Sequence, residues 1–118
     1  MDIMKLKLKD SPRIFNVGKN NNISISDMGD VFLEPNEQIT FVTENGDRHD
    51  FCRKNWGFYA TPSINSRLIN ENFLTALVAN EQNRIFIMVV EKSKIKEFRS
   101  YLSEENQNVV AWLGDSFK

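Results

Sequence analysis

The sequence predicts an α+β fold: a mostly antiparallel, curled sheet or half-barrel built from hairpins, with one or two C-terminal helices packed on it. Apolar and polar residues alternate through most of the chain, which is the pattern of strands with one buried face. Residues that favour turns separate these segments at short intervals. The apolar spacing changes to that of a helix only after Val90.

The first part of the chain predicts short strands. Met4, Leu6 and Leu8 alternate with lysines, and residues 13–17 are expected to form a second strand. Residues 18–22 are expected to form a loop, because Gly and Asn tolerate left-handed backbone angles. The same pattern continues along the chain, with strands expected at 23–26 and 31–33 and turns at 27–30 and 34–37.

A first hairpin is expected around Asn45-Gly46, the preferred pair for a tight turn between two strands. Its expected register places Thr43 opposite Arg48. The segments that would form its strands are residues 39–43 and 48–53.

A second hairpin is expected to join residues 73–78 to residues 84–90. Because residues 85–90 are apolar at every position, we expect them to form a central strand that is buried on both faces. The residues expected to be largely buried in the core are Phe41, Leu77, Phe86, Met88, Phe98 and Trp112.

Helical spacing of apolar residues begins at Ile95 and continues to Leu102, and Ser93 is the expected N-cap of this helix. A second short helix is expected over residues 109–113, ended by Gly114. These helices are expected to cover one face of the sheet.

The composition predicts a single domain over residues 1–118 that is soluble and cytoplasmic. The chain is 41% hydrophobic and 26% charged, as in globular proteins. Its net charge of -1 excludes a global field that would attract nucleic acid or anionic lipid. We see no signal peptide and no run of the ~18 apolar residues that a spanning helix needs. One cysteine excludes an internal disulfide.

The sequence has no familiar catalytic or metal-binding pattern. One Cys and one His do not make a structural zinc site, and no phosphate-binding loop or nucleophile elbow is present. His49 and Cys52 are three residues apart, so a strand directs them to opposite faces. We expect Cys52 to be buried and unreactive, and His49 to face outward or to lie under a helix. We therefore expect no cofactor and no metal, and we favour a role without catalysis.

Residues 54–68 are the segment most suggestive of a site. Trp56 and Phe58 are expected in the core, so that Trp56→Ala is destabilising, whereas Tyr59 is expected to face a partly exposed depression shared with Arg67. Pro62 ends the strand, and Ser63 is expected to cap a short helix over residues 64–70. Two interpretations stay open, core plus turn or a binding pocket. The candidate ligand- or partner-binding residues are Tyr59, Asn65, Ser66, Arg67 and His49.

Several segments between Met4 and Leu113 together resemble a family of small uncharacterised bacterial proteins. These segments are LEPNEQ at 33–38, KNWGFYATPS at 54–63, RL at 67–68, FLTALV at 73–78 and EENQ at 104–107. Members of the family are often encoded among genes for surface-polysaccharide and nucleotide-sugar biosynthesis. The resemblance implies a cytosolic accessory role in that metabolism and assigns no activity and no catalytic residue.

Three classes of function remain open. The first is an accessory or binding protein that recognises a protein partner or a small anionic ligand, such as a sugar phosphate, through Trp56, Tyr59, Asn65 and Arg67. The second is a small metal-independent enzyme acting on a sugar derivative, with Tyr59, His49 or an acid transferring a proton. The third is a nucleic-acid-binding domain using the lysines at positions 5, 7 and 9, which the slightly negative net charge disfavours.

Overall fold

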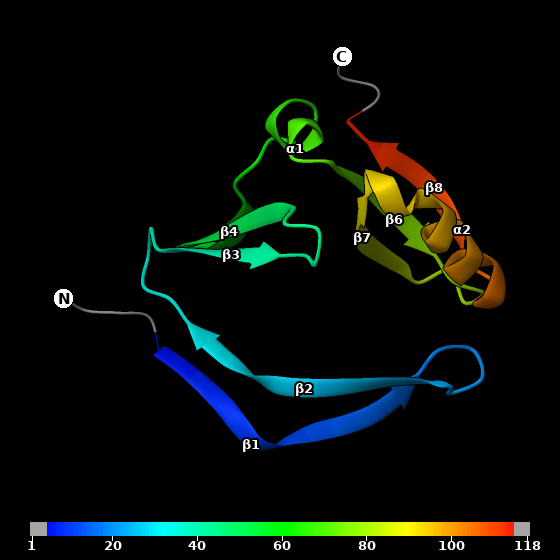
Figure 1. Ribbon diagram of the computed structural model, residues 1–118, viewed down its shortest axis with the longest axis horizontal. Coiled ribbons are helices and arrows are strands. Elements are labelled where there is room, and N and C mark those ends of the chain that lie inside the picture. Colours follow the sequence, from blue (N-terminus) through cyan, green and yellow to red (C-terminus); the bar gives the residue numbers. More distant parts are fainter. Residues whose placement is uncertain (1–4, 115–118) are drawn as a thin grey trace. The chain divides into compact units, whose positions relative to one another are not determined.

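The computed structural model describes residues 5–114 and consists mostly of antiparallel β-structure, with its longer helix near the C-terminus (Figure 1). The α+β fold class is confirmed. The strands are β1 Lys5–Val17, β2 Ile23–Phe32, β3 Gln38–Val42, β4 Arg48–Lys54, β5 Gly57–Ala60, β6 Phe73–Ala79, β7 Ile85–Glu91 and β8 Asn108–Leu113. The helices are α1 Arg67–Asn70, the 3₁₀ turn η1 Lys92–Lys94, and α2 Ile95–Glu104. Within residues 5–114, no helix has the length and apolar character needed to cross a membrane.

The strands form three sheets, with the orders β1-β2, β3-β4-β5 and β7-β6-β8. By internal contacts the chain divides into two compact units. The first unit comprises Met1–Ile39 and Phe51–Tyr59, and the second comprises Thr40–Asp50 and Ala60–Lys118. The single domain expected over residues 1–118 stays a prediction.

In the first unit, β1 and β2 form an antiparallel ribbon. The loop expected at residues 18–22 is confirmed, with Gly18 at φ 94° and Asn21 at φ 53°. The two separate strands expected before this loop are one strand, β1, whose pairing with β2 shifts register between Leu8 and Arg13. Met4, the first residue of the expected alternation, lies outside the described residues.

The turn expected at residues 27–30 is wrong, because β2 continues through it. Gly29 has a φ of 143°, and a Cβ atom at this position would overlap the carbonyl oxygen of Lys7 in β1. Glycine is therefore needed here for a close approach of two backbones at the register shift, not for a change of chain direction.

The hairpin around Asn45-Gly46 forms, but with a different register from the expected one. The Thr43 amide donates to the Asp47 carbonyl at 2.9 Å, and the Gly46 amide donates to the Thr43 carbonyl at 2.9 Å. Gly46 has a φ of 87°. The loop therefore has three residues and ends with glycine in the left-handed region, a common hairpin geometry that pairs Thr43 with Asp47 in place of Arg48.

The hairpin expected between residues 73–78 and 84–90 is confirmed as β6 and β7. The central position expected for residues 85–90 is wrong, because β7 lies at one edge and β6 is central, between β7 and β8 (Figure 1). A strand with an apolar residue at every position is compatible with the centre and with the edge of a sheet. The strand at the centre of this sheet is β6, whose Ala76 and Val78 side chains are fully buried.

The second helix expected over residues 109–113 is also wrong. Residues Asn108–Leu113 form β8, which pairs antiparallel with β6 and places Trp112 opposite Ala76. A run of five residues is too short to separate helical from strand spacing, and the β-branched Val109 and Val110 favour a strand.

The helix α2 is confirmed and covers one face of the sheet β7-β6-β8. Its Leu102 is buried against Ala76 and Val78, with Met88, Phe98, Val109 and Trp112 packed around this cluster. Ser93 lies within the 3₁₀ turn η1 and not at the N-cap, since α2 begins at Ile95 and no side chain caps it.

Of the residues expected in the core, Met88, Phe98 and Trp112 are partly buried and pack against the α2 cluster, and Leu77 is partly buried. Phe41 and Phe86 are 56% and 43% exposed, so their expected burial is wrong. Phe86 lies on the edge strand β7 and is not among the side chains that pack against the α2 cluster.

Candidate functional site

Trp56 and Phe58 are 71% and 65% exposed, so their expected place in the core is wrong. Trp56 lies in the turn between β4 and β5, and β5 begins only at Gly57, which has a φ of 143°. The alternation of a strand therefore does not apply to Trp56. Its ring lies against the ring of Tyr59, with centroids 6.1 Å apart. We call Trp56, Phe58 and Tyr59 the aromatic turn.

Polar contacts within the same unit hold the end of β4, which lies two residues before Trp56. Lys54 donates from Nζ to Oδ1 of Asn36 at 2.6 Å, and the Asn36 amide donates to the Arg53 carbonyl at 2.6 Å. Asn36 has a φ of 70° in the turn expected at residues 34–37, which the bond from the Glu37 amide to the Glu34 carbonyl confirms. The aromatic turn thus follows a strand end that is held by polar contacts.

Cys52 lies on β4, and its burial is confirmed at 8% exposure. Its Sγ lies 3.5 Å from the carbonyl oxygen of Arg53. Burial makes this thiol a small apolar side chain, and its expected lack of reactivity stays a prediction.

In the second unit, Arg67 makes two ion pairs. Its guanidinium lies 3.4 Å from Oδ2 of Asp50 and 3.3 Å from Oε1 of Glu71. Asp50 is buried and also accepts a hydrogen bond from Oγ1 of Thr40 at 2.5 Å. Because two carboxylates share one guanidinium, the cluster carries a formal charge of about -1 and disfavours an anionic ligand at Arg67. Arg67 instead ties α1 to β4.

The turn before α1 positions Arg67. The helix expected over residues 64–70 with Ser63 as its cap is wrong, because α1 starts only at Arg67 and its N-cap residue is Ser66. Ser63 supports the turn before α1, since its Oγ accepts a hydrogen bond from the Arg67 amide at 3.0 Å. Asn65 and Ser66 are exposed in this turn, and the Ser66 amide donates to the Ser63 carbonyl at 3.3 Å. Tyr59 belongs to the first unit. A site that unites Tyr59 with Arg67 therefore stays a prediction.

His49 is buried, with its ring 5.7 Å from the ring of Phe73, so the alternative that it faces outward is wrong. Burial lowers the pKa of His49 below its ordinary value of 6.5, and the charges of Asp50 and Glu71 oppose this change. The imidazole is therefore neutral near pH 7 and packs as part of the interior.

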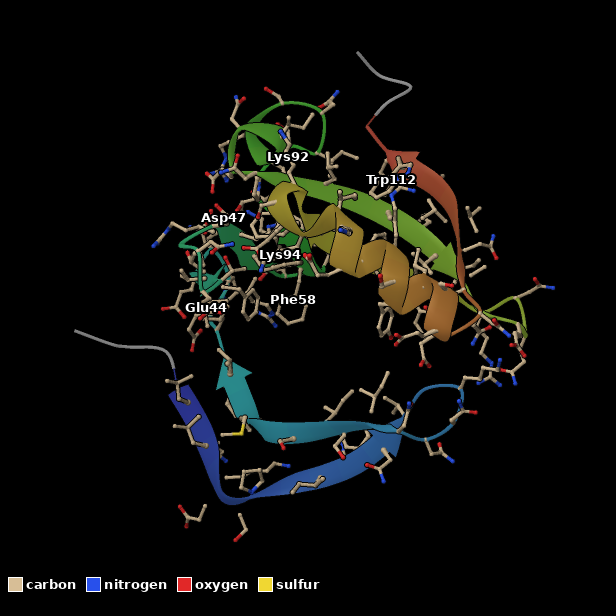
Figure 2. All side chains as sticks on the ribbon, turned by 45° about the vertical axis from the view of Figure 1, so that its right-hand side comes forward. Glu44, Asp47, Phe58, Lys92, Lys94 and Trp112 are labelled. Atoms are coloured by element: carbon tan, nitrogen blue, oxygen red, sulfur yellow. The ribbon has the colours of Figure 1, made fainter. Side chains whose placement is uncertain are left out.

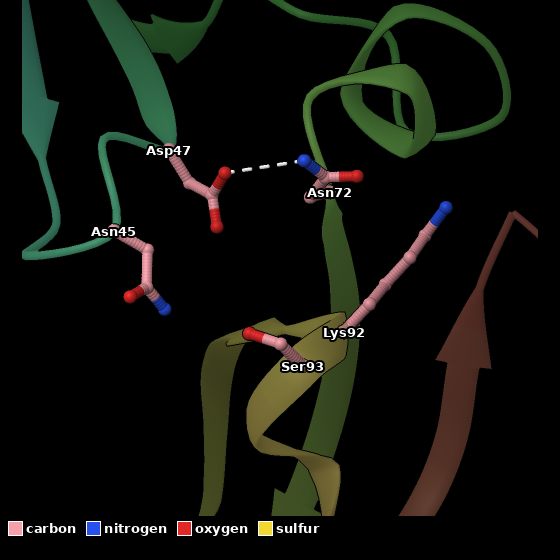
Figure 3. Close-up of a pocket in the computed structure, with 5 residues that line it drawn as sticks. All are labelled: Asn45, Asp47, Asn72, Lys92 and Ser93. Atoms are coloured by element: carbon pink, nitrogen blue, oxygen red, sulfur yellow. Dashed lines mark hydrogen bonds between the residues drawn. The ribbon is translucent and has the colours of Figure 1, made fainter.

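An open surface depression of about 640 Å³ lies in the second unit. Its lining residues are Asn45, Asp47, Asn72, Lys92 and Ser93 (Figure 3). Nδ2 of Asn72 donates to Oδ1 of Asp47 at 3.2 Å, and Nζ of Lys92 donates to the Ile69 carbonyl at 2.7 Å. Asp47 projects from the β3–β4 loop and Lys92 from the start of η1 (Figure 2). Amides, a hydroxyl and one charge of each sign suit a ligand rich in hydroxyl groups.

Sequence reasoning missed both Asp50 and the depression. Asp50 and Arg67 are 17 residues apart and meet only in the folded chain. Asn45 and Asp47 belong to a sequence pattern that predicts a turn, and this pattern does not indicate ligand binding. Among residues 5–114, no group of three or more His, Cys, Asp or Glu side chains is placed to hold a metal ion.

The lysine stripe of β1 is partly engaged within its own ribbon. Lys9 forms an ion pair with Asp27 at 3.1 Å, and Nζ of Lys7 lies 5.3 Å from the centre of the Phe32 ring. The hydrogen bond from Lys9 is the main cause that lowers the pKa of Asp27. These contacts reduce the positive charge that the stripe can offer to a phosphate backbone.

No protein-family model, curated protein or solved structure matches the chain. The family resemblance drawn from the sequence therefore stays a prediction.

Proposed function

We propose that the chain is a cytosolic accessory protein without catalytic activity, and that it binds a protein partner through the aromatic turn. The observation that carries this proposal is the exposure of Trp56 and Phe58 next to Tyr59. Large aromatic side chains in water mark interaction surfaces, and Trp and Tyr dominate the energetic centres of protein interfaces.

The polar residues beside the aromatic turn support a protein partner over a small ligand. Protein interfaces combine an apolar centre with a polar rim, and Lys54, two residues before Trp56, supplies a charged group that contacts the Asn36 amide. The family resemblance supports a bacterial enzyme of surface-polysaccharide or nucleotide-sugar biosynthesis as this partner.

A second candidate function rests on the depression at Asp47 and Lys92. Its mixed polar lining supports a neutral, hydroxyl-rich ligand such as a sugar derivative. In a small metal-independent enzyme, the Asp47 carboxylate would be the proton-transfer group. A nucleic-acid-binding role receives less support, because Lys9 is paired with Asp27.

The aromatic turn is tested by co-purification from the native organism with tagged wild type, a Trp56→Ala/Phe58→Ala double variant, and Val110→Ala as a control. Val110 is an exposed apolar residue of the other unit. We expect a partner that wild type and the control retain and the double variant loses. With the purified partner, calorimetry should show a loss of about 2 kcal/mol or more in the double variant. Equal affinity of all three proteins would contradict the proposal.

The second candidate is tested separately. Purified chain is titrated with neutral sugars and with sugar phosphates, and Asp47→Asn is compared with wild type. The depression has a ligand of its own if wild type binds a neutral sugar and Asp47→Asn does not. Both proteins should then bind the partner equally. Absence of binding at millimolar concentrations would remove this candidate.

A further inference from the structure

Strand β7 is an edge strand without the features that usually protect such edges. Within residues 5–114, β6 is the only strand paired with β7 (Figure 1). From Ile85 to Val90 the strand contains no charge, no proline and no glycine. Natural proteins interrupt exposed edges with lysine, proline, short length or bulges, because an unprotected edge pairs with other strands. An uninterrupted apolar edge therefore indicates a surface that pairs with another strand.

The opposite edge of the same sheet is protected. The pairing of β8 with β6 shifts register between Leu77 and Val78, so that Val109 and not Val110 lies opposite Val78. Such an irregularity makes an edge a poor template for a further strand. The contrast between the two edges favours β7 as the site of pairing.

The hydrogen-bond pattern shows which groups of β7 point outward. The Lys92 amide donates to the Asn72 carbonyl, and the Asn80 amide donates to the Arg84 carbonyl, so these are hydrogen-bonded pairs at the two ends of the β6–β7 ladder. Paired positions alternate in an antiparallel ladder. The N–H and C=O groups of Ile85, Ile87 and Val89 therefore point to the free edge.

The side chains of these three residues are also open to solvent. Ile85 is 53% exposed and Ile87 is 71% exposed. They lie on the sheet face opposite Met88, whose side chain packs against the α2 cluster. Backbone donors, backbone acceptors and apolar side chains are thus available together on one strand.

We propose that β7 pairs in an antiparallel manner with β7 of a second copy of this chain, about a twofold axis at Ile87. The two sheets then form one six-stranded sheet. Ile87 lies opposite Ile87 of the second copy, and Ile85 lies opposite Val89 of the second copy. Both are pairs of apolar side chains at outward-pointing hydrogen-bonded positions.

Charge selects this register over its two neighbours. A twofold axis requires each residue to face its own copy or a residue an even number of positions away, so the neighbouring axes lie at Phe86 and Met88. The axis at Met88 would place Arg84 opposite Lys92 of the second copy, twice, with like charges facing. The axis at Phe86 would place Glu91 in line with Glu81 of the second copy, also twice. The axis at Ile87 places Arg84 opposite Val90 and Glu91 opposite Asn83, without like charges. Of these three registers, the one with the axis at Ile87 is therefore the one without facing like charges.

The full chain is tested by light scattering and sedimentation equilibrium over micromolar to millimolar concentrations. We expect wild type to have twice the mass of one chain, and Ile87→Lys, which brings two ammonium groups together at the axis, to have the mass of one chain. Val110→Lys, at the protected edge, is the control and should remain dimeric. Circular dichroism checks that each variant is folded.

A paired exchange separates lost pairing from misfolding. Ile85→Lys alone should weaken the dimer at least tenfold, and Ile85→Lys with Val89→Glu should restore it, because each new lysine then faces a new glutamate of the second copy. Ile87→Cys should form a disulfide-linked dimer on mild oxidation, since facing residues in such a pair have Cα atoms ~5.5 Å apart.

Three results would overturn the proposal. A wild-type chain that stays monomeric at every concentration would show that another molecule covers β7 or that nothing does. A dimer that survives Ile87→Lys would place the interface elsewhere. An Ile85→Lys chain that stays fully dimeric would reject the axis at Ile87, because that result favours Ile85 facing Glu91.

Discussion

Arg67 holds a carboxylate that is largely removed from water. Asp50 is buried, and its partners are the Thr40 hydroxyl and the half-exposed Arg67 guanidinium. Removal of one member of a buried pair leaves the other charged and poorly solvated, which is costly even where the intact pair contributes little. The role that the structure favours for Arg67 is therefore support of α1 on β4.

Arg67→Ala is expected to destabilise the fold by about 1–3 kcal/mol, because it leaves Asp50 without its counter-ion. The lower part of this range allows for the solvent that screens the exposed guanidinium. Urea unfolding measures the change, with Arg99→Ala on the exposed side of α2 as a control expected to stay within roughly 0.5 kcal/mol. Equal stability of both variants would show that the ion pair is not needed.

Trp56→Ala is expected to change the free energy of unfolding by roughly 0.5 kcal/mol or less, because the side chain is mostly in water already. Leu68→Ala is the matched comparison, since Leu68 is fully buried and its truncation should cost ~2–5 kcal/mol. Thermal melts of both variants check this. A large loss of stability in Trp56→Ala would contradict this prediction and would indicate that Trp56 is buried in the core.

The buried imidazole of His49 makes stability depend on pH. Its pKa in the folded protein lies below the ordinary 6.5, so the unfolded chain binds a proton more readily. Stability is therefore expected to be independent of this group above pH 6.5 and to fall as the pH drops below it. Urea unfolding between pH 7.5 and about 5 measures the slope. In His49→Gln the free energy of unfolding should change less with pH. An unchanged pH dependence would show that other groups cause it.

At the scale of elements, local turn chemistry was predictable and the place of a strand in its sheet was not. The Asn45-Gly46 hairpin and the loop after β1 depend on residues that are neighbours in sequence. The edge position of β7 depends on β8, which is 17 or more residues further along the chain. The ion pair of Asp50 with Arg67 has the same non-local origin, so only the turn that carries Arg67 was visible in the sequence.

Gly29 and Gly57 allow a matched test of the close approach in the ribbon. Both have a φ of 143°, but an added Cβ meets the Lys7 carbonyl only at Gly29, whereas nothing lies within 4 Å at Gly57. Both alanine variants carry similar backbone strain, of order 1–3 kcal/mol. Gly29→Ala should in addition reduce amide hydrogen-exchange protection along β1 and β2, and Gly57→Ala should not. Equal protection in the two variants would contradict the close approach.

At the scale of the whole molecule, exposed apolar side chains occur in both units. The ribbon exposes Leu8 and Ile14, the aromatic turn exposes Trp56, and β7 exposes Ile87. A two-stranded ribbon is only marginally stable alone in water, so these side chains favour a chain that functions in contact with other molecules. The two surfaces proposed for such contacts belong to different units.

Because the two surfaces share no residues, their functions are expected to be separable. Trp56→Ala/Phe58→Ala should lose the partner and keep the mass of a dimer, whereas Ile87→Lys should become a monomer and keep the partner affinity of one binding site within about threefold. Light scattering gives the mass, and calorimetry with the purified partner gives the affinity. Loss of both properties in either variant would mean that partner binding and self-association depend on each other, and that one of the two surfaces is assigned wrongly.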